Sequence, residues 1–365
     1  MMDAIRFLYI ILLCSAKLNI RLDPRKGDIS QDRYSTIKIN AGSVIPVNVM
    51  DIGVLEYYGL ITLGDNASQY SFKFDTGFTS MCITSSTCNG CQHNRYVCKG
   101  VYCKSTQTVV SFNYSYGNAT GNITTDLFQF GSTNFSSTFI SITNQSGKLN
   151  LNSDGICGLS FDSVYSPNNI ITTLISQQII SEAVVGLYLN HTSISQITFG
   201  GYDEDLAKNI EWLPLINQTV WQVSLQSVAI GDIKYSKAKS AILDTGISHL
   251  IVPRNVFIQY IFLLSSHYSL CDVYYPLGLY GCILGAKQDL TGFKDVSFIF
   301  ADKNYTISVK DMVYLIHDKD SGYYIGCVLM EPWDNDLWVV GANFFQDRYV
   351  VLDYQNARLG ISNME

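Results

Sequence analysis

Apolar and polar residues alternate over short stretches along most of the chain, which is the period expected of half-buried β-strands. The clearest example is the pair of stretches 58–64 and 70–74, which the turn-forming Gly64-Asp65-Asn66 connects. This pattern predicts a β-hairpin that delivers Asp75 at the end of a strand. Comparable strands are predicted at residues 138–142, 196–199, 221–230, 296–300, 338–340 and 349–353. Because the connections are short, we expect mostly antiparallel sheets.

Two stretches have the apolar spacing of a helix. Ser166-Pro167 begins one that runs to about Glu182, and Pro253 begins another that runs to about Leu264. Proline is favoured in the first turn of a helix, which supports both starts. A chain with many short strands and two peripheral helices is predicted to be mainly β.

One short signature occurs twice. Residues 74–79, Phe-Asp-Thr-Gly-Phe-Thr, recur at residues 243–248 as Leu-Asp-Thr-Gly-Ile-Ser. A second matched pair lies downstream of each copy, at Ile156-Cys157-Gly158 and Val339-Val340-Gly341. A single Asp-Thr-Gly is most often a turn, because aspartate caps turns and glycine accepts a positive φ. Two copies in matched surroundings indicate a duplicated fold that brings two carboxyl groups together.

Two facing carboxyl groups, those of Asp75 and Asp244, can act as an acid and a base. Close like charges cannot both ionise cheaply, so at working pH one carboxyl keeps a proton while the other is ionised. The repeat therefore predicts a catalytic pair of aspartates.

Composition and charge limit the function classes. The chain has 365 residues, of which 47% are hydrophobic and 15% charged, which suits one large two-lobed domain or two ordinary ones. Residues 17–41 carry a net charge of +3, whereas the remainder from Gly42 carries −10. The acidic body argues against a nucleic-acid partner. A basic leader on an acidic body suggests either an electrostatically held prosegment or a solvated tail.

The beginning of the chain predicts entry into the secretory pathway. Arg6 precedes an apolar run from Phe7 to Cys14, and small residues follow, so residues 1–16 are predicted to be a signal peptide. The run is too short to span a bilayer, and we expect no membrane anchor. Ten cysteines and several Asn-x-Ser/Thr sequons suit an oxidising compartment that glycosylates proteins. We expect the destination to be a lysosome, a lytic vacuole or the extracellular space, and the sequence leaves open which sequons carry glycans.

Further motifs follow one another in a fixed order. They are Tyr57-Tyr58-Gly59, Ser115-Tyr116-Gly117, Asp154-Gly155-Ile156-Cys157-Gly158-Leu159, Phe199-Gly200-Gly201-Tyr202-Asp203, Trp212-Leu213-Pro214-Leu215, Val220-Trp221-Gln222-Val223 and Leu337-Trp338-Val339-Val340-Gly341. With the two Asp-Thr-Gly copies, they resemble the pepsin and cathepsin D family of two-lobed aspartic endopeptidases over nearly the whole chain after the leader.

The resemblance implies a fold and a function. The fold is all-β, with two lobes related by a pseudo-twofold axis and a cleft between them. The implied parts are a prosegment at 17–45, an N-terminal catalytic lobe at 46–211 and a C-terminal catalytic lobe at 212–365. The implied protein is a monomeric endopeptidase, made as a zymogen and inhibited by its own prosegment, that cleaves proteins and peptides without a cofactor or metal.

The resemblance also assigns roles within the site. Asp75 and Asp244 would hold one water molecule between them, and the ionised carboxylate would remove its proton as it attacks the peptide carbonyl. The resemblance assigns support of the catalytic loops to Thr76, Gly77, Thr245 and Gly246. The threonines would hydrogen-bond across to the opposite loop, while the glycines permit close backbone approach.

Two further roles are implied outside the loops. Tyr116 and Gly117 would lie on a hairpin flap that closes over bound peptide. Lys38, in Lys38-Ile39-Asn40, would place its ammonium between Asp75 and Asp244 in an inactive precursor. A plain exposed lysine is the alternative for this residue.

Two residues depart from the family pattern. Family members usually carry serine or threonine directly after each Asp-Thr-Gly, whereas this chain has Phe78 and Ile247. Loss of a hydrogen-bond donor to an anion disfavours ionisation, so we expect raised pKa values for the pair and an optimum in mildly acidic solution. Alternatively, water or the hydroxyls of Thr79 and Ser248 compensate. These departures also leave open a weak or silent relative that only binds peptides.

The cysteines suggest several bridges. The resemblance implies a disulfide between Cys282 and Cys327. Disulfides are favoured over zinc ligation, with the connectivity open, for Cys88, Cys91, Cys98 and Cys103. At least one thiol is expected to be free, or paired between chains, among Cys82, Cys157 and Cys271. A buried free cysteine acting as a small hydrophobic residue is the ordinary outcome.

Two other hydrolase classes lack their motifs. The five histidines are dispersed and do not form His-Glu-x-x-His, the zinc-binding pattern of metalloproteases. The sequence also has no Gly-x-Ser-x-Gly elbow. A metal-dependent or serine hydrolase is therefore disfavoured.

Overall fold

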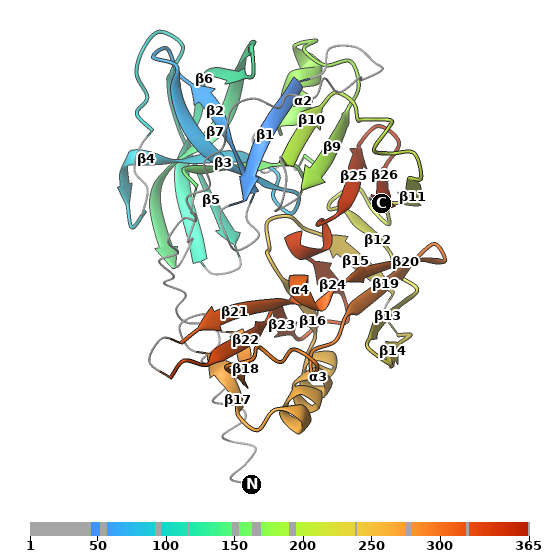
Figure 1. The fold of residues 1–365 in the computed structure, drawn as a ribbon. Helices are drawn as coiled ribbons and strands as arrows, with labels where there is room; N and C mark the ends of the chain where they lie inside the picture. The colour runs from blue at the N-terminus through green and yellow to red at the C-terminus, as the bar shows by residue number, and fades with distance from the viewer. Residues whose placement is uncertain are drawn as a thin grey trace. The chain divides into compact units, whose positions relative to one another are not determined.

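The computed structural model describes residues 45–51, 57–91, 96–114, 117–147, 153–162, 169–189, 195–237, 239–274, 279–318 and 321–363. Strands predominate over helices in this part of the chain, as the all-β prediction requires (Figure 1). The contacts divide the chain into two compact units. Of the described residues, unit 1 contains Leu225–Ala241 and His249–Asn343, and unit 2 contains those before Leu225, Ile242–Ser248 and those from Phe344 onward. The predicted signal peptide lies outside the described residues.

Unit 2 is built on a large, mostly antiparallel sheet. Its strands are β1 (Ile45–Asp51), β2 (Tyr57–Leu63), β3 (Ser68–Asp75), β4 (Met81–Asn89), β5 (Lys104–Tyr114), β6 (Gly117–Phe130), β7 (Thr133–Gly147), β8 (Gly155–Gly158), β9 (Val184–Leu189), β10 (Ser195–Phe199), β11 (Glu211–Pro214), β25 (Arg348–Asp353) and β26 (Arg358–Asn363). Their order across the sheet is β11-β26-β25-β9-β10-β1-β2-β3-β8-β4-β7-β6-β5.

The predicted hairpin before Asp75 is confirmed. Strands β2 and β3 pair in an antiparallel register that places Tyr58 opposite Lys73. Gly64 takes a φ of +80° in the turn, which glycine adopts without strain. Strand β8 runs parallel to β3, and its Gly158 lies beside Asp75. The second matched motif of the sequence thus lies directly against the first signature.

Aromatic side chains fill the sheet's core beside this hairpin. Phe128 stacks on Phe135 with ring centroids 5.8 Å apart, and Phe139 meets Phe128 edge-on at 5.4 Å. Such pairs add to the apolar burial that stabilises the sheet. Fully buried Trp221 donates its indole N–H to the carbonyl of Leu159, two residues after Cys157 (2.7 Å). The core therefore holds β8 in place behind the first aspartate loop.

Unit 1 contains smaller sheets. One has the order β14 (Ile233–Tyr235), β13 (Ser227–Ile230), β19 (Val296–Phe300), β20 (Lys303–Ile307), and a second has the order β17 (Cys271–Tyr274), β18 (Leu279–Gly285), β22 (Tyr324–Val328), β21 (Val313–His317). Strand β16 (Leu250–Pro253) pairs with β23 (Met330–Trp333) in parallel and with β24 (Trp338–Val340) in antiparallel orientation.

The strand predicted at 221–230 is divided in two. Strand β12 (Gln222–Ser224) ends before Leu225, which donates its N–H to the carbonyl of Lys239, and β13 begins at Ser227. The backbone partner changes at this point, because Gln226 donates its N–H to Ile299. An unbroken apolar alternation does not reveal such a change of partner. The strands predicted at 138–142, 196–199, 296–300, 338–340 and 349–353 are present.

Helix α2 (Ile170–Ser176) is shorter than predicted. Asn169 caps it by accepting a hydrogen bond from the N–H of Thr172 (2.8 Å), and the predicted start at Ser166-Pro167 lies outside the described residues. The helix stops before Glu182 because Gln178 takes a φ of +58°, a left-handed conformation that cannot continue an α-helix.

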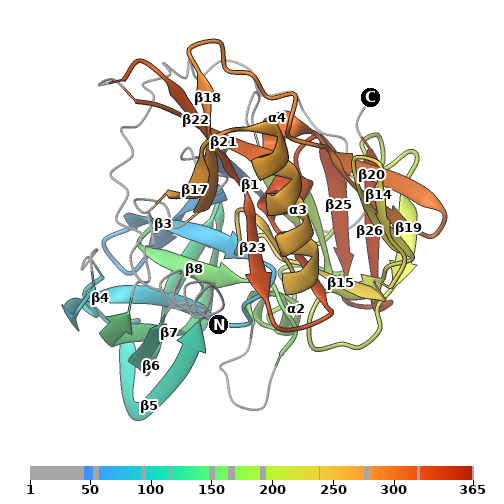
Figure 2. The ribbon, with the colours of Figure 1, turned by 90° about the horizontal axis from the view of Figure 1, so that it is seen from below.

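Helix α3 (Arg254–His267) agrees with the prediction for a helix starting at Pro253. Its buried residues, Val256, Tyr260 and Leu264, follow at intervals of four and form one face. The helix packs on β16 and β23 of the same unit (Figure 2). The remaining elements are α4 (Val309–Met312), the 3₁₀ turn η1 (Ala342–Phe344) and β15 (Ser240–Leu243), which ends directly before Asp244.

Candidate active site

The two Asp-Thr-Gly loops have matching local geometry, and both lie in unit 2. Gly77 donates its N–H to Asp75 Oδ1 at 2.8 Å, and Gly246 donates its N–H to Asp244 Oδ1 at the same distance. In each loop the residue after the glycine, Phe78 or Ile247, also donates its N–H to the backbone carbonyl of the aspartate. Hydrogen bonds from the backbone hold each carboxylate in one orientation.

The threonines join the two loops through four buried hydrogen bonds. The N–H of Thr76 donates to Thr245 Oγ1 (3.0 Å), and the N–H of Thr245 donates to Thr76 Oγ1 (2.9 Å). The hydroxyl of Thr76 donates to the carbonyl of Leu243, and that of Thr245 donates to Phe74, both at 2.8 Å. Both side chains are buried. The bonds expected between the threonines are therefore present, although a role in catalysis stays a prediction.

The glycines make the close approach of the loops possible. A Cβ placed on Gly77 would overlap the carboxyl group of Asp244, and one placed on Gly246 would overlap that of Asp75, each closer than 3.0 Å. No side chain fits at either position without displacing the carboxyl group. The reciprocal contacts also show that each loop's backbone lies against the other loop's aspartate.

The carboxyl groups of Asp75 and Asp244 hydrogen-bond to each other, so the structure brings together the two residues that the repeat predicted. Burial raises the pKa of both carboxyls, and the charge of Asp75 raises the pKa of Asp244 further. The main cause is burial, so these shifts do not test the predicted effect of the missing hydroxyls, which stays a prediction. Such a pair can share one proton between an acid and a base.

A lysine that the sequence analysis did not single out belongs to this site. Lys73, only 9% exposed, donates from Nζ to the carbonyl of Gly246 at 2.8 Å. Its positive charge lowers the pKa of Asp75 and of Asp244, against the effect of burial. A signal was available in the sequence, since a lysine between two phenylalanines and two residues before the aspartate shares a strand face with it.

The residue directly after each glycine, Phe78 or Ile247, has no hydroxyl that could donate a hydrogen bond to an aspartate. Phe78 packs on Phe112 of β5, with ring centroids 5.3 Å apart, and so belongs to an apolar cluster. The hydroxyl of Thr79, one of the two proposed substitutes, donates to the carbonyl of Phe161 at 2.9 Å. That proton is therefore directed away from Asp75.

The predicted flap is described in part. Strands β5 and β6 form a hairpin in which Gly117 lies opposite Tyr114. Tyr116 lies outside the described residues, as does Lys38 of the leader. The contact between Phe112 and Phe78 places the described arm of the hairpin next to the first aspartate loop.

The predicted disulfide between Cys282 and Cys327 is wrong in this structure. Cys282 is bonded to Cys271, directly opposite it in the antiparallel pair of β17 and β18. In the pair of β18 and β22, Cys327 lies opposite Gly281 and Cys282 opposite Gly326. Residues one step apart on a strand project from opposite faces, so Cys282 and Cys327 point away from each other across the sheet.

The other described cysteines divide into two groups. Two disulfides, Cys88–Cys91 and Cys98–Cys103, settle the connectivity that the sequence left open. Among the described residues, the free thiols are those of Cys82, Cys157 and Cys327, all buried. Burial raises the pKa of Cys82 to about 12, as expected for inert thiols in a core.

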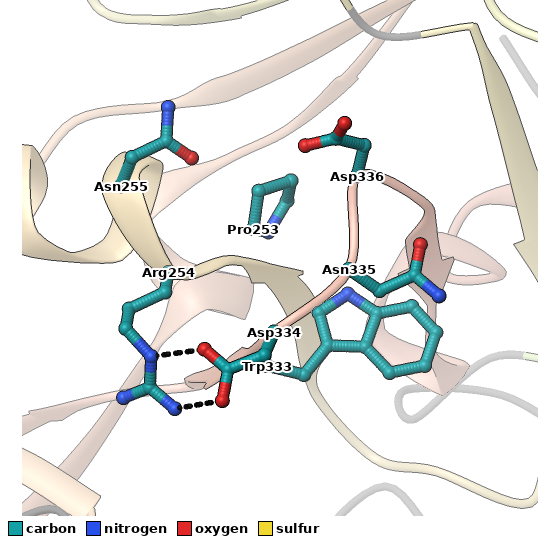
Figure 3. A pocket seen from close by; sticks show the side chains of 7 residues that line it. All are labelled: Pro253, Arg254, Asn255, Trp333, Asp334, Asn335 and Asp336. Carbon is teal, nitrogen blue, oxygen red and sulfur yellow. Dashed lines mark hydrogen bonds and ion pairs between the residues drawn. The ribbon is translucent and has the colours of Figure 1, made fainter.

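A hollow of about 410 Å³ lies in unit 1 (Figure 3). It is lined by Pro253, Arg254, Asn255, Trp333, Asp334, Asn335 and Asp336. Arg254 and Asp334 form a two-pronged ion pair at its edge. None of the predicted site residues lines this hollow, and it contributes nothing to the aspartate pair.

Two further observations concern only the described part of the chain. No group of three or more histidine, cysteine or acidic side chains there is arranged to hold a metal ion. No helix there is long and apolar enough to cross a membrane.

Comparison with known proteins identifies the family. The sequence profile of eukaryotic aspartyl proteases matches residues 56–364. Rhizopuspepsin-3 of Rhizopus niveus is 27% identical over 321 residues, which are 82% of this chain and 76% of that protein. Cathepsin E of Cavia porcellus is 26% identical over 358 residues, 93% and 87% of the two chains. Pepsin A of Gallus gallus is 27% identical over 332 residues, 86% and 85%. The chain therefore belongs to the eukaryotic aspartyl protease family and is an aspartic-type endopeptidase with the family's two-lobed, all-β fold.

Proposed function

We propose that the chain hydrolyses peptide bonds of proteins with a water molecule activated between Asp75 and Asp244. The observation that carries the proposal is the hydrogen-bonded pair of buried carboxyls held by two matching loops. The bonds between Thr76 and Thr245 support it, because they fix the separation of the loops before substrate arrives.

The pair supplies both a base and an acid. We assign the shared proton to Asp244, whose pKa burial and the charge of Asp75 raise to about 7. Ionised Asp75 takes a proton from water as the water oxygen attacks the peptide carbonyl, and protonated Asp244 donates a hydrogen bond to the carbonyl oxygen. The C–N bond then breaks, and the proton held by Asp75 passes to the leaving nitrogen. No covalent intermediate forms on the protein.

The pKa directions set the proposed pH range. Activity requires Asp75 ionised and Asp244 protonated, so it falls on the acid side as Asp75 gains a proton and on the other side as Asp244 loses one. Since both pKa values are raised, the optimum lies in mildly acidic solution rather than below about pH 3.

We also propose a secretory precursor. The three disulfides in the described part of the chain suit an oxidising compartment, and an acidic lysosome, lytic vacuole or extracellular space matches the pH range. In the precursor, residues 17–45 would inhibit the enzyme, with Lys38 between the aspartates at neutral pH. A Lys38→Ala precursor that stays latent at neutral pH would count against that role.

The test is a digest of denatured globin between about pH 3 and 7 by the mature protein. Wild type should cleave with a mildly acidic optimum, and a statine-type inhibitor should stop it. Asp75→Asn should reduce kcat/KM by at least about 10³-fold, because the base is lost.

A matched control separates loss of catalysis from loss of folding. Asp295 of unit 1 also accepts a backbone N–H, from Val309 at 2.8 Å, so Asp295→Asn should keep wild-type activity. Cleavage that survives Asp75→Asn contradicts the mechanism. A folded wild type that binds the inhibitor yet cleaves nothing indicates instead a silent relative, the alternative that Phe78 and Ile247 raise.

A further inference from the structure

Lys73 stands out among the charged residues of unit 2 because it is buried beside the aspartates. It lies in β3 between buried Phe72 and Phe74, and its own side chain is 9% exposed. Burying an ammonium is costly unless hydrogen bonds and opposite charges compensate. At this position the ammonium donates a hydrogen bond to the carbonyl of Gly246, and its charge interacts with those of the two aspartates.

The lysine connects the first aspartate strand to the second aspartate loop. Its Nζ donates to the carbonyl of Gly246 (2.8 Å), while the N–H of Gly246 donates to Asp244 Oδ1 (2.8 Å). Two adjacent peptide groups of the second loop are thus held, one by Lys73 and one by the carboxylate. The hydrogen bond from Lys73 is separate from the four threonine bonds. It has no counterpart from the strand before Asp244, where Ile242 holds the corresponding position.

The charge of Lys73 lies where an anion must be stabilised. Residues 73 and 75 share a face of β3, so the ammonium and the carboxyl of Asp75 project to the same side. The site lacks a hydroxyl directly after each glycine, where Phe78 and Ile247 stand, and the hydroxyl of Thr79 is bonded elsewhere. A fixed cation can do what those donors do, which is to favour the ionised form of a nearby carboxyl.

The other titratable groups around Lys73 stay neutral in acid. Across the strand pair, its partner on β2 is Tyr58, whose pKa burial raises. On the side of β8 the directly paired residue is Ile156, which does not titrate. Burial raises the pKa of the thiols of Cys82 and Cys157, and the charge of Asp75 raises it further. Among the described residues named here, the groups that change charge near Lys73 in acid are therefore the two aspartates.

We propose that Lys73 is a positioning residue of the aspartate pair, whose ammonium fixes the second loop and provides the positive charge that keeps one carboxyl ionised in acid. This inference rests on the proposed function and adds a residue and a pH determinant to it. In its absence both carboxyls would hold their protons to higher pH, and the working range would move upward.

The test compares variants that separate charge from hydrogen bonding. Lys73→Met removes both, Lys73→Gln removes the charge and keeps an N–H donor, and Lys73→Arg keeps the charge. Lys294→Met is the matched control, since half-buried Lys294 also donates to a backbone carbonyl, that of Thr291 (2.9 Å). The readout is the pH profile of kcat/KM on a peptide substrate.

We expect both limbs of the profile to move upward by about one pH unit in Lys73→Met and in Lys73→Gln. Lys73→Arg should stay close to wild type, and Lys294→Met should be unchanged. If the methionine variant does not fold, the glutamine variant carries the test. Folded variants without the charge whose limbs stay at the wild-type pH would overturn the proposal, even if their kcat falls.

A second readout needs no catalysis. The melting temperature of wild type should fall between about pH 4.5 and 7.5 as the buried carboxyls lose protons, and the fall should be larger in Lys73→Met and Lys73→Gln. An unchanged fall contradicts the proposal. If wild type cleaves nothing, the proposed function fails, and this readout still decides the role of Lys73.

Discussion

At the scale of single residues, the site is set by a few groups whose positions depend on one another. The aspartates were predictable because a repeated Asp-Thr-Gly has few explanations other than a facing pair. For Lys73 the sequence held only a partial signal, its place two residues before Asp75 on the same strand face, because alternation along a strand does not reveal that both faces are buried. Its role emerges only when the carbonyl of Gly246, more than 170 positions away in the chain, lies beside it.

The raised pKa of Asp244 predicts how folding stability depends on pH. A carboxyl whose pKa is higher in the folded state contributes stability that is fully present below its unfolded pKa, near 3.9, and is lost as pH rises toward about 7. Asp244→Asn removes this titration. The variant should therefore gain stability relative to wild type as pH rises from about 4 to 7.5, by on the order of 1–2 kcal/mol.

Urea unfolding at both pH values measures the difference. A variant whose stability relative to wild type is the same at the two pH values would show that Asp244 has an ordinary pKa in the folded protein. Asp295→Asn, on an exposed aspartate of unit 1 outside the aspartate pair, serves as the control.

At the scale of elements, the sequence pattern predicted those helices and strands that depend mainly on neighbouring residues. The hairpin of β2 and β3 and the helix α3 agree with alternation, turn residues and a proline start. The end of α2, the break between β12 and β13 and the pairing of Cys282 could not be read from the sequence. Each depends on a backbone conformation or on a strand register that distant residues impose.

The register of β17, β18 and β22 predicts the disulfide pattern of unit 1. Cys271 and Cys282 lie directly opposite each other with Cα atoms 4.1 Å apart, whereas Cys327 of β22 projects from the other face of the sheet. Peptide mapping without reduction should recover Cys271 linked to Cys282 and Cys327 as a free thiol. Cys271→Ser should lower stability by about 3 kcal/mol, because the short loop is no longer closed.

A linked peptide containing Cys282 and Cys327 would contradict this register, because the two side chains could then share one face of the sheet. Cys327→Ser is the matched control. It removes a buried thiol without breaking a disulfide, so it should leave the link between Cys271 and Cys282 intact.

At the scale of the whole molecule, the decisive feature is that residues far apart in the chain meet within unit 2. The chain leaves unit 2 after Ser224 and returns to it at Ile242, just before Asp244. The threonine hydrogen bonds, the glycine contacts and Lys73 hold the Asp244 loop against the Asp75 loop. The central claim is accordingly that Asp75 and Asp244 act as one chemical unit.

A double-mutant cycle measures that claim most directly. The values of kcat/KM are compared for wild type, Asp75→Asn, Asp244→Asn and the double variant on one peptide substrate. If the pair is one unit, each single variant loses at least about 10³-fold and the double variant loses scarcely more, because the first change already removes the shared proton chemistry. Losses that multiply, or a single variant that keeps a tenth or more of wild-type activity, would contradict the account.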